Sequence, residues 1–236
     1  MSRASLLLLA ALMLGGAGTG AAQSGSNPVS GVFWPELDLY YRVGEQVRLY
    51  GLATYTLGPS PLVDNAQYGA NIDFFAKRKL IFKHRPAVDV LAFDRVQPVM
   101  LRVGYRYSTD LGTSDPSPQD RVLFELTGRL TSGSFSIADR NGFDMRWSSG
   151  EYSTRYRNRI WIENTVRLGS YQLAPYANAE WFYSIQDAEW TKVRYEAGLH
   201  LPVRRLFAVE PYASWEDYWN GSPDLRGFGL NLVLSW

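Results

Sequence analysis

Hydrophobic and polar residues alternate along most of this chain. Between residues 47 and 57, apolar or small side chains occupy every second position. Arg48, Tyr50 and Thr54 lie between them, and the same period of two recurs at 99–107 and 191–201. Because successive side chains of a β-strand point to opposite faces of the sheet, the pattern predicts strands with one apolar and one polar face.

The alternating segments are long, at about 10 to 13 residues against the usual five or six. A tilted strand needs about 9 to 11 residues to cross a bilayer. Short and longer connections alternate between the segments, as in barrels with short periplasmic turns and longer external loops. The longer ones are expected at 110–119, 148–152, 185–189 and 220–224. The segments are 32–42, 47–57, 67–75, 97–108, 119–130, 135–147, 153–167, 172–184, 190–201, 206–217 and 225–236.

These eleven segments are one short of an even number. Bacterial single-chain barrels have an even number of strands, which places both ends of the chain in the periplasm. We therefore predict an all-β fold, a transmembrane antiparallel up-and-down β-barrel of about twelve strands, with ten as the alternative. The poorly patterned stretch at 76–95 is where the twelfth strand is expected.

The C-terminal segment alternates up to the last residue printed. Its apolar positions are Phe228, Leu230, Leu232, Leu234 and Trp236. An apolar strand that ends on an aromatic residue resembles the signal that outer-membrane barrels present to their assembly machinery. We therefore expect that machinery to be a partner during biogenesis. The alternative is an ordinary final strand of a soluble sheet.

The first residues have the pattern of a targeting segment. Arg3 supplies a positive charge, an apolar run covers 6–14, and Gly20-Ala21-Ala22 offers small residues for cleavage. We predict a cleaved signal peptide at 1–22, a flexible lead at 23–31 and the barrel at 32–236. No later apolar run approaches the roughly 20 residues of a membrane-spanning helix. The predicted location is the bacterial outer membrane, with its lipids as partners.

Composition narrows the remaining classes. The chain has no cysteine, which excludes a disulfide scaffold, a thiolate metal site and a cysteine nucleophile. Its 24 lysines and arginines against 23 acidic residues give no reason to expect nucleic-acid binding. Aromatic residues make up 14%, which suits girdles at the membrane surfaces, and Tyr40 and Tyr55 are among the candidates. Oligomeric state is left open.

Several stretches resemble a family of uncharacterised bacterial proteins, the DUF2490 family. They are FWPELDLYYR at 33–42, LRVGYRY at 101–107, DRNGFDMRW at 139–147, RYRNR at 155–159 and GFGL at 227–230. In the third stretch the family often has an arginine where this chain has Gly142. The resemblance implies an outer-membrane barrel and supplies no activity, so no functional residue can be carried over from it.

Charged residues gather on the polar faces of the predicted strands. Arginine facing lipid at the midplane costs about 2–4 kcal/mol, so these residues are expected in the lumen. Three of the arginines follow one another on one strand face at 155, 157 and 159. The candidates for the lumen lining are Arg48, Arg102, Arg106, Arg129, Arg146, Arg155, Arg157, Arg159, Arg194, Glu36, Asp38, Glu125, Glu163, Glu180 and Glu196. Asp144 and Glu210 share these faces.

Two functions fit such a lumen. Near-equal numbers of opposite charges favour a structural barrel whose interior is stabilised by arginine–carboxylate ion pairs. The local arginine excess favours a narrow, porin-like pore that selects anionic solutes. A twelve-stranded barrel is intermediate between filled and open barrels, so size does not decide.

Two further classes stay open as alternatives, a lipid-modifying outer-membrane enzyme and a secreted soluble β-barrel that binds a ligand. An enzyme is disfavoured because neither His84 nor His200 belongs to a recognisable serine motif. Two histidines also make a zinc site improbable, and no phosphate-binding loop or other cofactor motif is present, so we expect no metal and no cofactor.

Overall fold

The computed structural model describes residues 29–59, 64–76, 97–111, 116–169, 171–204, 206–219 and 221–236. These residues form strands and turns, and among them there is no helix of the length and hydrophobicity that a membrane crossing requires. The strands are β1 (Val29–Arg42), β2 (Val47–Thr56), β3 (Asn65–Phe75), β4 (Val99–Asp110), β5 (Gln119–Ser132), β6 (Phe135–Ser148), β7 (Glu151–Asn164), β8 (Val166–Leu168), β9 (Tyr171–Ser184), β10 (Glu189–Arg204), β11 (Phe207–Tyr218) and β12 (Leu225–Ser235).

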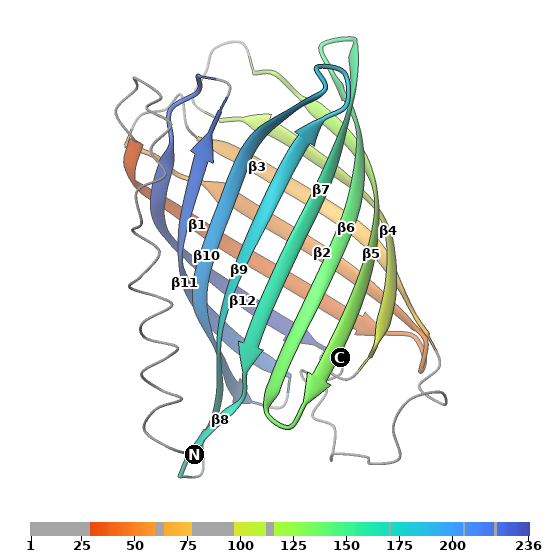
Figure 1. The fold of residues 1–236 in the computed structure, drawn as a ribbon, viewed down its shortest axis with the longest axis vertical. Coiled ribbons are helices and arrows are strands. Elements are labelled where there is room, and N and C mark those ends of the chain that lie inside the picture. Colours follow the sequence, from red (N-terminus) through yellow and green to blue (C-terminus); the bar gives the residue numbers. More distant parts are fainter. Residues whose placement is uncertain are drawn as a thin grey trace.

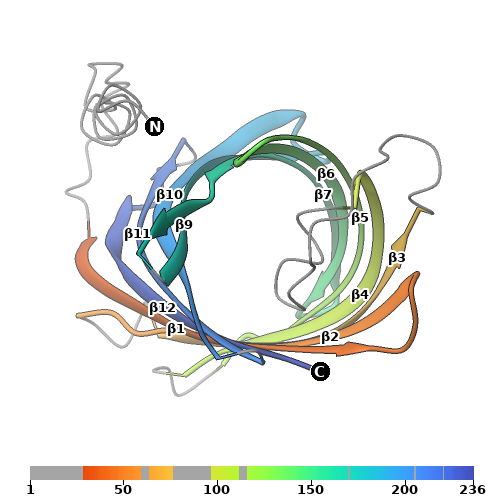
Figure 2. The same ribbon diagram turned by 90° about the horizontal axis from the view of Figure 1, so that it is seen from below.

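The strands curl into a closed barrel (Figures 1 and 2). Each strand from β1 to β7 pairs with the next, β7 pairs with β9, and β9 to β12 pair in sequence order. β12 then pairs with β1 and closes a ring of eleven strands. The short β8 pairs only with the start of β9 and extends beyond the ring at one end. We call the end where β12 finishes the lower end, and the opposite end the upper end.

The barrel closes through a parallel pair of strands. Val29 pairs with Leu225 at the upper end, and Tyr40 pairs with Ser235 at the lower end. The prediction of an all-β barrel is therefore confirmed, whereas the fully antiparallel arrangement is wrong and the closed ring has eleven strands with β8 as a twelfth outside it. With every other neighbour antiparallel, an odd number of strands forces the last strand to run parallel to the first. β1 consequently starts at the upper end, whereas β12 finishes at the lower end.

The eleven segments found from alternation correspond to the eleven strands of the ring. Nothing lies between β3 and β4, because they pair directly from Asn65–Asp110 to Phe75–Met100. The stretch proposed for a twelfth strand lies outside the described residues except for Ala76. β1 begins at Val29, so residues 29–31, assigned to the flexible lead, belong to the sheet.

Alternation sets which side chains face the interior. On β5, Leu123, Glu125 and Thr127 are buried, whereas the intervening Phe124 and Leu126 are 42% and 52% exposed. On β12, Phe228, Leu230 and Leu232 lie on the outer face with Trp236, as expected from the C-terminal pattern. The outside of the barrel is therefore an apolar band of large exposed side chains.

One polar cluster interrupts this outer face at mid-height. The Asn158 amide on β7 donates to Asp139 and Asn141 on β6, at 2.7 and 3.2 Å. The Tyr156 hydroxyl donates to Asn141 at 2.5 Å. The four side chains satisfy one another, which lowers the cost of exposing them on an apolar surface.

The connections at the upper end include a very tight one. Residues 148–152, expected to form a longer loop, form a two-residue turn at Ser149 and Gly150, with φ of 52° and 83°. Two successive positive φ angles are the signature of the primed turns that match the twist of a hairpin. The sequence spacing alone did not distinguish this turn from a loop.

Candidate functional site in the barrel lumen

The barrel encloses a cavity of about 550 Å³. Side chains from all eleven strands of the ring line it. It reaches Thr56 and Leu225 near the upper end, and Phe75 and Ser235 near the lower end. The interior is thus neither plugged by a segment of the described chain nor packed to full density.

A network of ion pairs begins on β2 and winds around the inner wall. The Arg48 Nε atom donates to Asp73 on β3 at 2.9 Å, and the Arg102 Nε atom on β4 donates to the same carboxylate at 2.6 Å. Asp73 is fully buried. Two guanidinium groups therefore bind one carboxylate whose side chain is fully buried.

Arg157 on β7 is the centre of this network. Its guanidinium lies 2.7 Å from Glu125 on β5, 3.0 Å from Asp144 on β6 and 3.0 Å from Glu180 on β9. Arg159 shares Glu180 at 2.6 Å. A single arginine thereby connects three neighbouring strands through charge-assisted hydrogen bonds.

Arginines outnumber carboxylates in this network. Seven arginines lie within 4.0 Å of the four carboxylates Asp73, Glu125, Asp144 and Glu180. The inner faces of β4 to β7 therefore carry an excess of positive charge, which we call the arginine wall. It consists of Arg102, Arg106, Arg121, Arg129, Arg140, Arg146, Arg155, Arg157 and Arg159.

A second group of charges lies on β1 and β11, and we call it the carboxylate wall. It consists of Glu36, Asp38 and Glu210. Asp38 accepts hydrogen bonds from the Tyr50 hydroxyl and the Asn231 amide, both at 2.9 Å.

The other two carboxylates of this wall have a tyrosine and a histidine as partners. Glu36 accepts a hydrogen bond from the Tyr212 hydroxyl, and Glu210 pairs with His200. In the described part of the chain, no lysine or arginine nitrogen lies within 4.0 Å of any of the three carboxylates.

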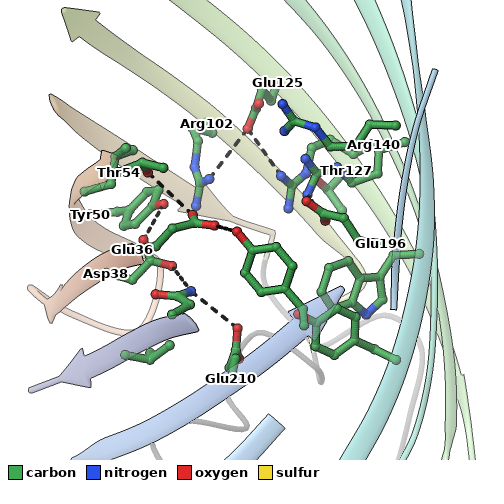
Figure 3. A pocket seen from close by; sticks show the side chains of 18 of the residues that line it. Glu36, Asp38, Tyr50, Thr54, Arg102, Glu125, Thr127, Arg140, Glu196 and Glu210 are labelled. Carbon is green, nitrogen blue, oxygen red and sulfur yellow. Dashed lines mark hydrogen bonds and ion pairs between the residues drawn. The ribbon is translucent and has the colours of Figure 1, made fainter. Parts of the chain in front are cut away.

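The two walls face each other across the lumen. In the ring, β1 is five strands from β6 by one route and six strands by the other, so the two are diametrically opposed. Figure 3 shows Glu36, Asp38 and Glu210 on one side of the cavity and Glu125 and Arg140 on the other, with Arg102 between them over the Tyr50 ring. Where the carboxyl groups are ionised, charges of opposite sign on opposite walls would create an electric field across the lumen.

Aromatic side chains narrow the cavity between these walls. The rings of Trp161 and Tyr176 stack with their centroids 4.2 Å apart. They pack against Val32, Trp34 and Tyr212. Tyr212 lies flat over β12, where a Cβ added at Gly229 would approach its ring to 2.0 Å. Glycine on the inner face of β12 therefore makes room for the ring of a neighbouring strand.

This cavity is lined by most of the residues that were proposed from the sequence. Of the fifteen, twelve line it, and the other three also lie on inner strand faces. Arg155 donates to Asp144 at 2.8 Å, Arg146 donates to Gln119 at 3.0 Å, and Glu180 is buried beneath its arginine partners. The structure brings Arg157 together with Glu125 and Glu180, whereas Glu36 and Asp38 form no ion pair within 4.0 Å with an arginine of the described residues.

Sequence reasoning missed several contributors. Asp73 and Arg140 belong to alternating stretches on β3 and β6, so their inward orientation could have been predicted. Tyr40, placed among the interfacial aromatics, lies in the lumen and stacks on Tyr50 with centroids 4.6 Å apart. Tyrosine occurs on both faces of a barrel, so its type does not distinguish the two.

The features that would support an enzyme are weak. Within the described ranges, His200 bonds to Glu210 and to no serine or threonine hydroxyl. No three histidine, aspartate or glutamate side chains of these ranges are grouped to hold a metal ion. His84 lies outside the described residues.

Comparisons with known proteins give a family and distant likenesses. A family model described as "Protein of unknown function (DUF2490)" matches residues 85–217. No curated protein matches the chain. One solved structure, outer-membrane expressed OmpT of Vibrio cholerae, is 12% identical with a TM-score of 0.36 over 75% of this chain and 58% of that one.

A second structure, in-vitro folded OmpT of the same organism, is 9% identical with a TM-score of 0.33 over 76% of this chain and 77% of that one. The chain thus spans little more than half the length of the first of these proteins.

Proposed function

The chain belongs to the DUF2490 family of proteins of unknown function, and we propose that it is an outer-membrane β-barrel whose lumen is a narrow pore for small hydrophilic solutes. The observation that carries the proposal is the cavity that every strand of the ring lines, with charged walls on opposite sides. A charged cavity that extends along the barrel inside an apolar outer wall is the arrangement from which a narrow diffusion pore can be formed.

The outer face supports insertion into a membrane. The ring strands have 10 to 16 residues, which meets the roughly 9 to 11 that a tilted strand needs. Their outward side chains are mostly large and apolar, and several exceed 40% exposure, such as Phe124, Leu126 and Phe228. A soluble barrel with so much exposed apolar surface would aggregate.

The partners of two carboxyl groups support water in the lumen. Glu36 and Asp38 have hydroxyl and amide partners, and no lysine or arginine nitrogen of the described residues lies within 4.0 Å of them. Ionising a carboxyl group without a cation is very costly in a dry interior, so water in the lumen would be needed for either group to carry a charge. A barrel packed solely for stability would pair these groups as it pairs Glu125 with Arg157.

The test is conductance of the mature protein, refolded in detergent and inserted into planar bilayers. We expect discrete channel events of small conductance. Absence of events from protein that shows heat-modifiable gel migration would remove the pore and leave a structural barrel. Recovery of the native protein in a soluble cell fraction, with no protein in the outer membrane, would overturn the membrane location.

A further inference from the structure

We propose that the lumen selects short zwitterions, molecules with an ammonium group at one end and a carboxylate at the other. This inference rests on the proposed pore and names its substrate class. The ammonium group would bind the carboxylate wall, and the carboxylate would bind the arginine wall. Small peptides of two or three residues are the solutes with this chemistry and length.

The carboxylate wall has acceptors to spare for an ammonium group. Glu36 and Asp38 line the cavity and receive hydrogen bonds only from tyrosine, threonine and asparagine groups. Asn231, only 8% exposed, donates its amide to Asp38, and its buried Oδ1 atom has no hydrogen-bond partner among the described residues. An ammonium group would supply three hydrogen-bond donors and a positive charge, and these oxygens have no such partner among the described residues.

The arginine wall has donors to spare for a carboxylate. Arg106 lines the cavity, and in the described chain it has neither a carboxylate within 4.0 Å nor a partner for its buried Nε atom. Among the described residues, Arg140 pairs only with Glu125, at 4.0 Å, and its Nε atom has no hydrogen-bond partner. A guanidinium group binds a carboxylate through two parallel hydrogen bonds.

The width of the barrel sets the length of the solute. Eleven strands about 4.8 Å apart and tilted by about 40° give a backbone diameter of roughly 22 Å. Extended glutamate and arginine side chains reach roughly 5 to 7 Å inward, which leaves about 10 Å between the walls. An extended peptide spans about 3.3–3.6 Å per residue, so two or three residues fit between the walls.

Opposed walls also disfavour solutes with a single charge. A simple anion drawn to Arg106 is repelled by Glu36 and Asp38, and a simple cation meets the reverse situation. A zwitterion aligned with the field across the lumen gains at both ends. Complementarity of this kind increases entry rates more than binding strength, which is what a pore needs.

Permeation into proteoliposomes tests the inference with two solutes of nearly equal size. Triglycine is the zwitterion, and its N-acetylated, C-amidated diglycine analogue carries no charge. We expect triglycine to enter at least threefold faster. Changing Glu36→Gln together with Asp38→Asn should bring the ratio of the two entry rates close to one. Arg106→Gln as a single change should also lower this ratio. Gln67→Asn, on the lumen wall but outside both charge clusters, should leave it unchanged.

The outcomes separate the two proposals. If neither solute enters and no conductance is found, the pore itself fails. If conductance is present and both solutes enter at equal rates, the pore stands and zwitterion selection is overturned. Arg106→Gln provides an independent test should the carboxylate variant fail to fold, and a ratio that it leaves unchanged also overturns the selection.

Discussion

Arg157 on β7 reaches Glu125 on β5 at 2.7 Å, although β6 lies between their two strands. The residue of β6 in register with both is Gly142, which has no side chain to block the contact. A Cβ at this position would lie 3.3 Å from Glu125 and 3.7 Å from Arg157. The absence of a side chain at Gly142 therefore gives the central arginine of the lumen its third carboxylate.

Removing the charge of Arg157 should destabilise the barrel strongly. Arg157→Gln leaves Glu125, Asp144 and Glu180 short of a shared cation, and breaking a buried pair costs about 3–5 kcal/mol. We expect a loss of about 3 kcal/mol in urea unfolding of protein folded into vesicles. Arg106→Gln, which removes no described ion pair, should change stability by less than about 1 kcal/mol. Equal losses in the two variants would contradict the role given to the network.

Arginine substitutions on the outer face should show how deep each position lies in the proposed membrane. Leu126 lies near the middle of β5 and is 52% exposed, whereas Leu130 lies near its lower end and is 73% exposed. Leu126→Arg should cost about 2–4 kcal/mol and Leu130→Arg about 0–1 kcal/mol. Unfolding free energies in vesicles provide the measurement. Similar costs at the two positions would argue that this face does not lie in lipid.

The parallel pairing of β1 with β12 should not tolerate a side chain at Gly227. A Cβ there would lie 1.7 Å from the Val32 carbonyl oxygen of β1, and backbone atoms cannot move aside as a flexible side chain can. Gly227→Ala should cost more than about 3 kcal/mol or prevent closure, because overpacking is most severe against backbone.

The matched control is Gly128→Ala on β5, where an added Cβ meets nothing within 4 Å. It should fold like the parent protein and retain heat-modifiable gel migration. Normal migration of Gly227→Ala would show that β1 and β12 do not pair as described.

Shortening an aromatic side chain in the lumen should widen the proposed pore. Trp161 stacks on Tyr176 inside the barrel, so Trp161→Ala removes a large obstacle from the passage. Single-channel conductance should increase by about twofold or more, on the premise that this cluster is the narrowest point. Trp147→Ala, on the outer face and 40% exposed, should leave conductance unchanged. Conductance that is identical in both variants would place the constriction elsewhere.

The sequence by itself determined the strands and their two faces. Side chains of a strand alternate with a period of two, so the position of Arg157 or Glu125 within its segment assigns it to the lumen without knowledge of any neighbour. The apolar outer face of β12 followed from Phe228 to Trp236 by the same reasoning. The ends of most strands were predictable because turns interrupt the alternation.

Only the tertiary structure decided how the sheet closes and which charges meet. Alternation is local and identical in barrels of ten, eleven or twelve strands, whereas closure depends on hydrogen bonds between β1 and β12 at opposite ends of the chain. Pairing of Arg157 with Glu125 depends on register across β6, and the position of Glu36 and Asp38 opposite Glu125 depends on β1 lying opposite β6. These relationships arise from the curvature of the closed sheet, which no local pattern of residues specifies.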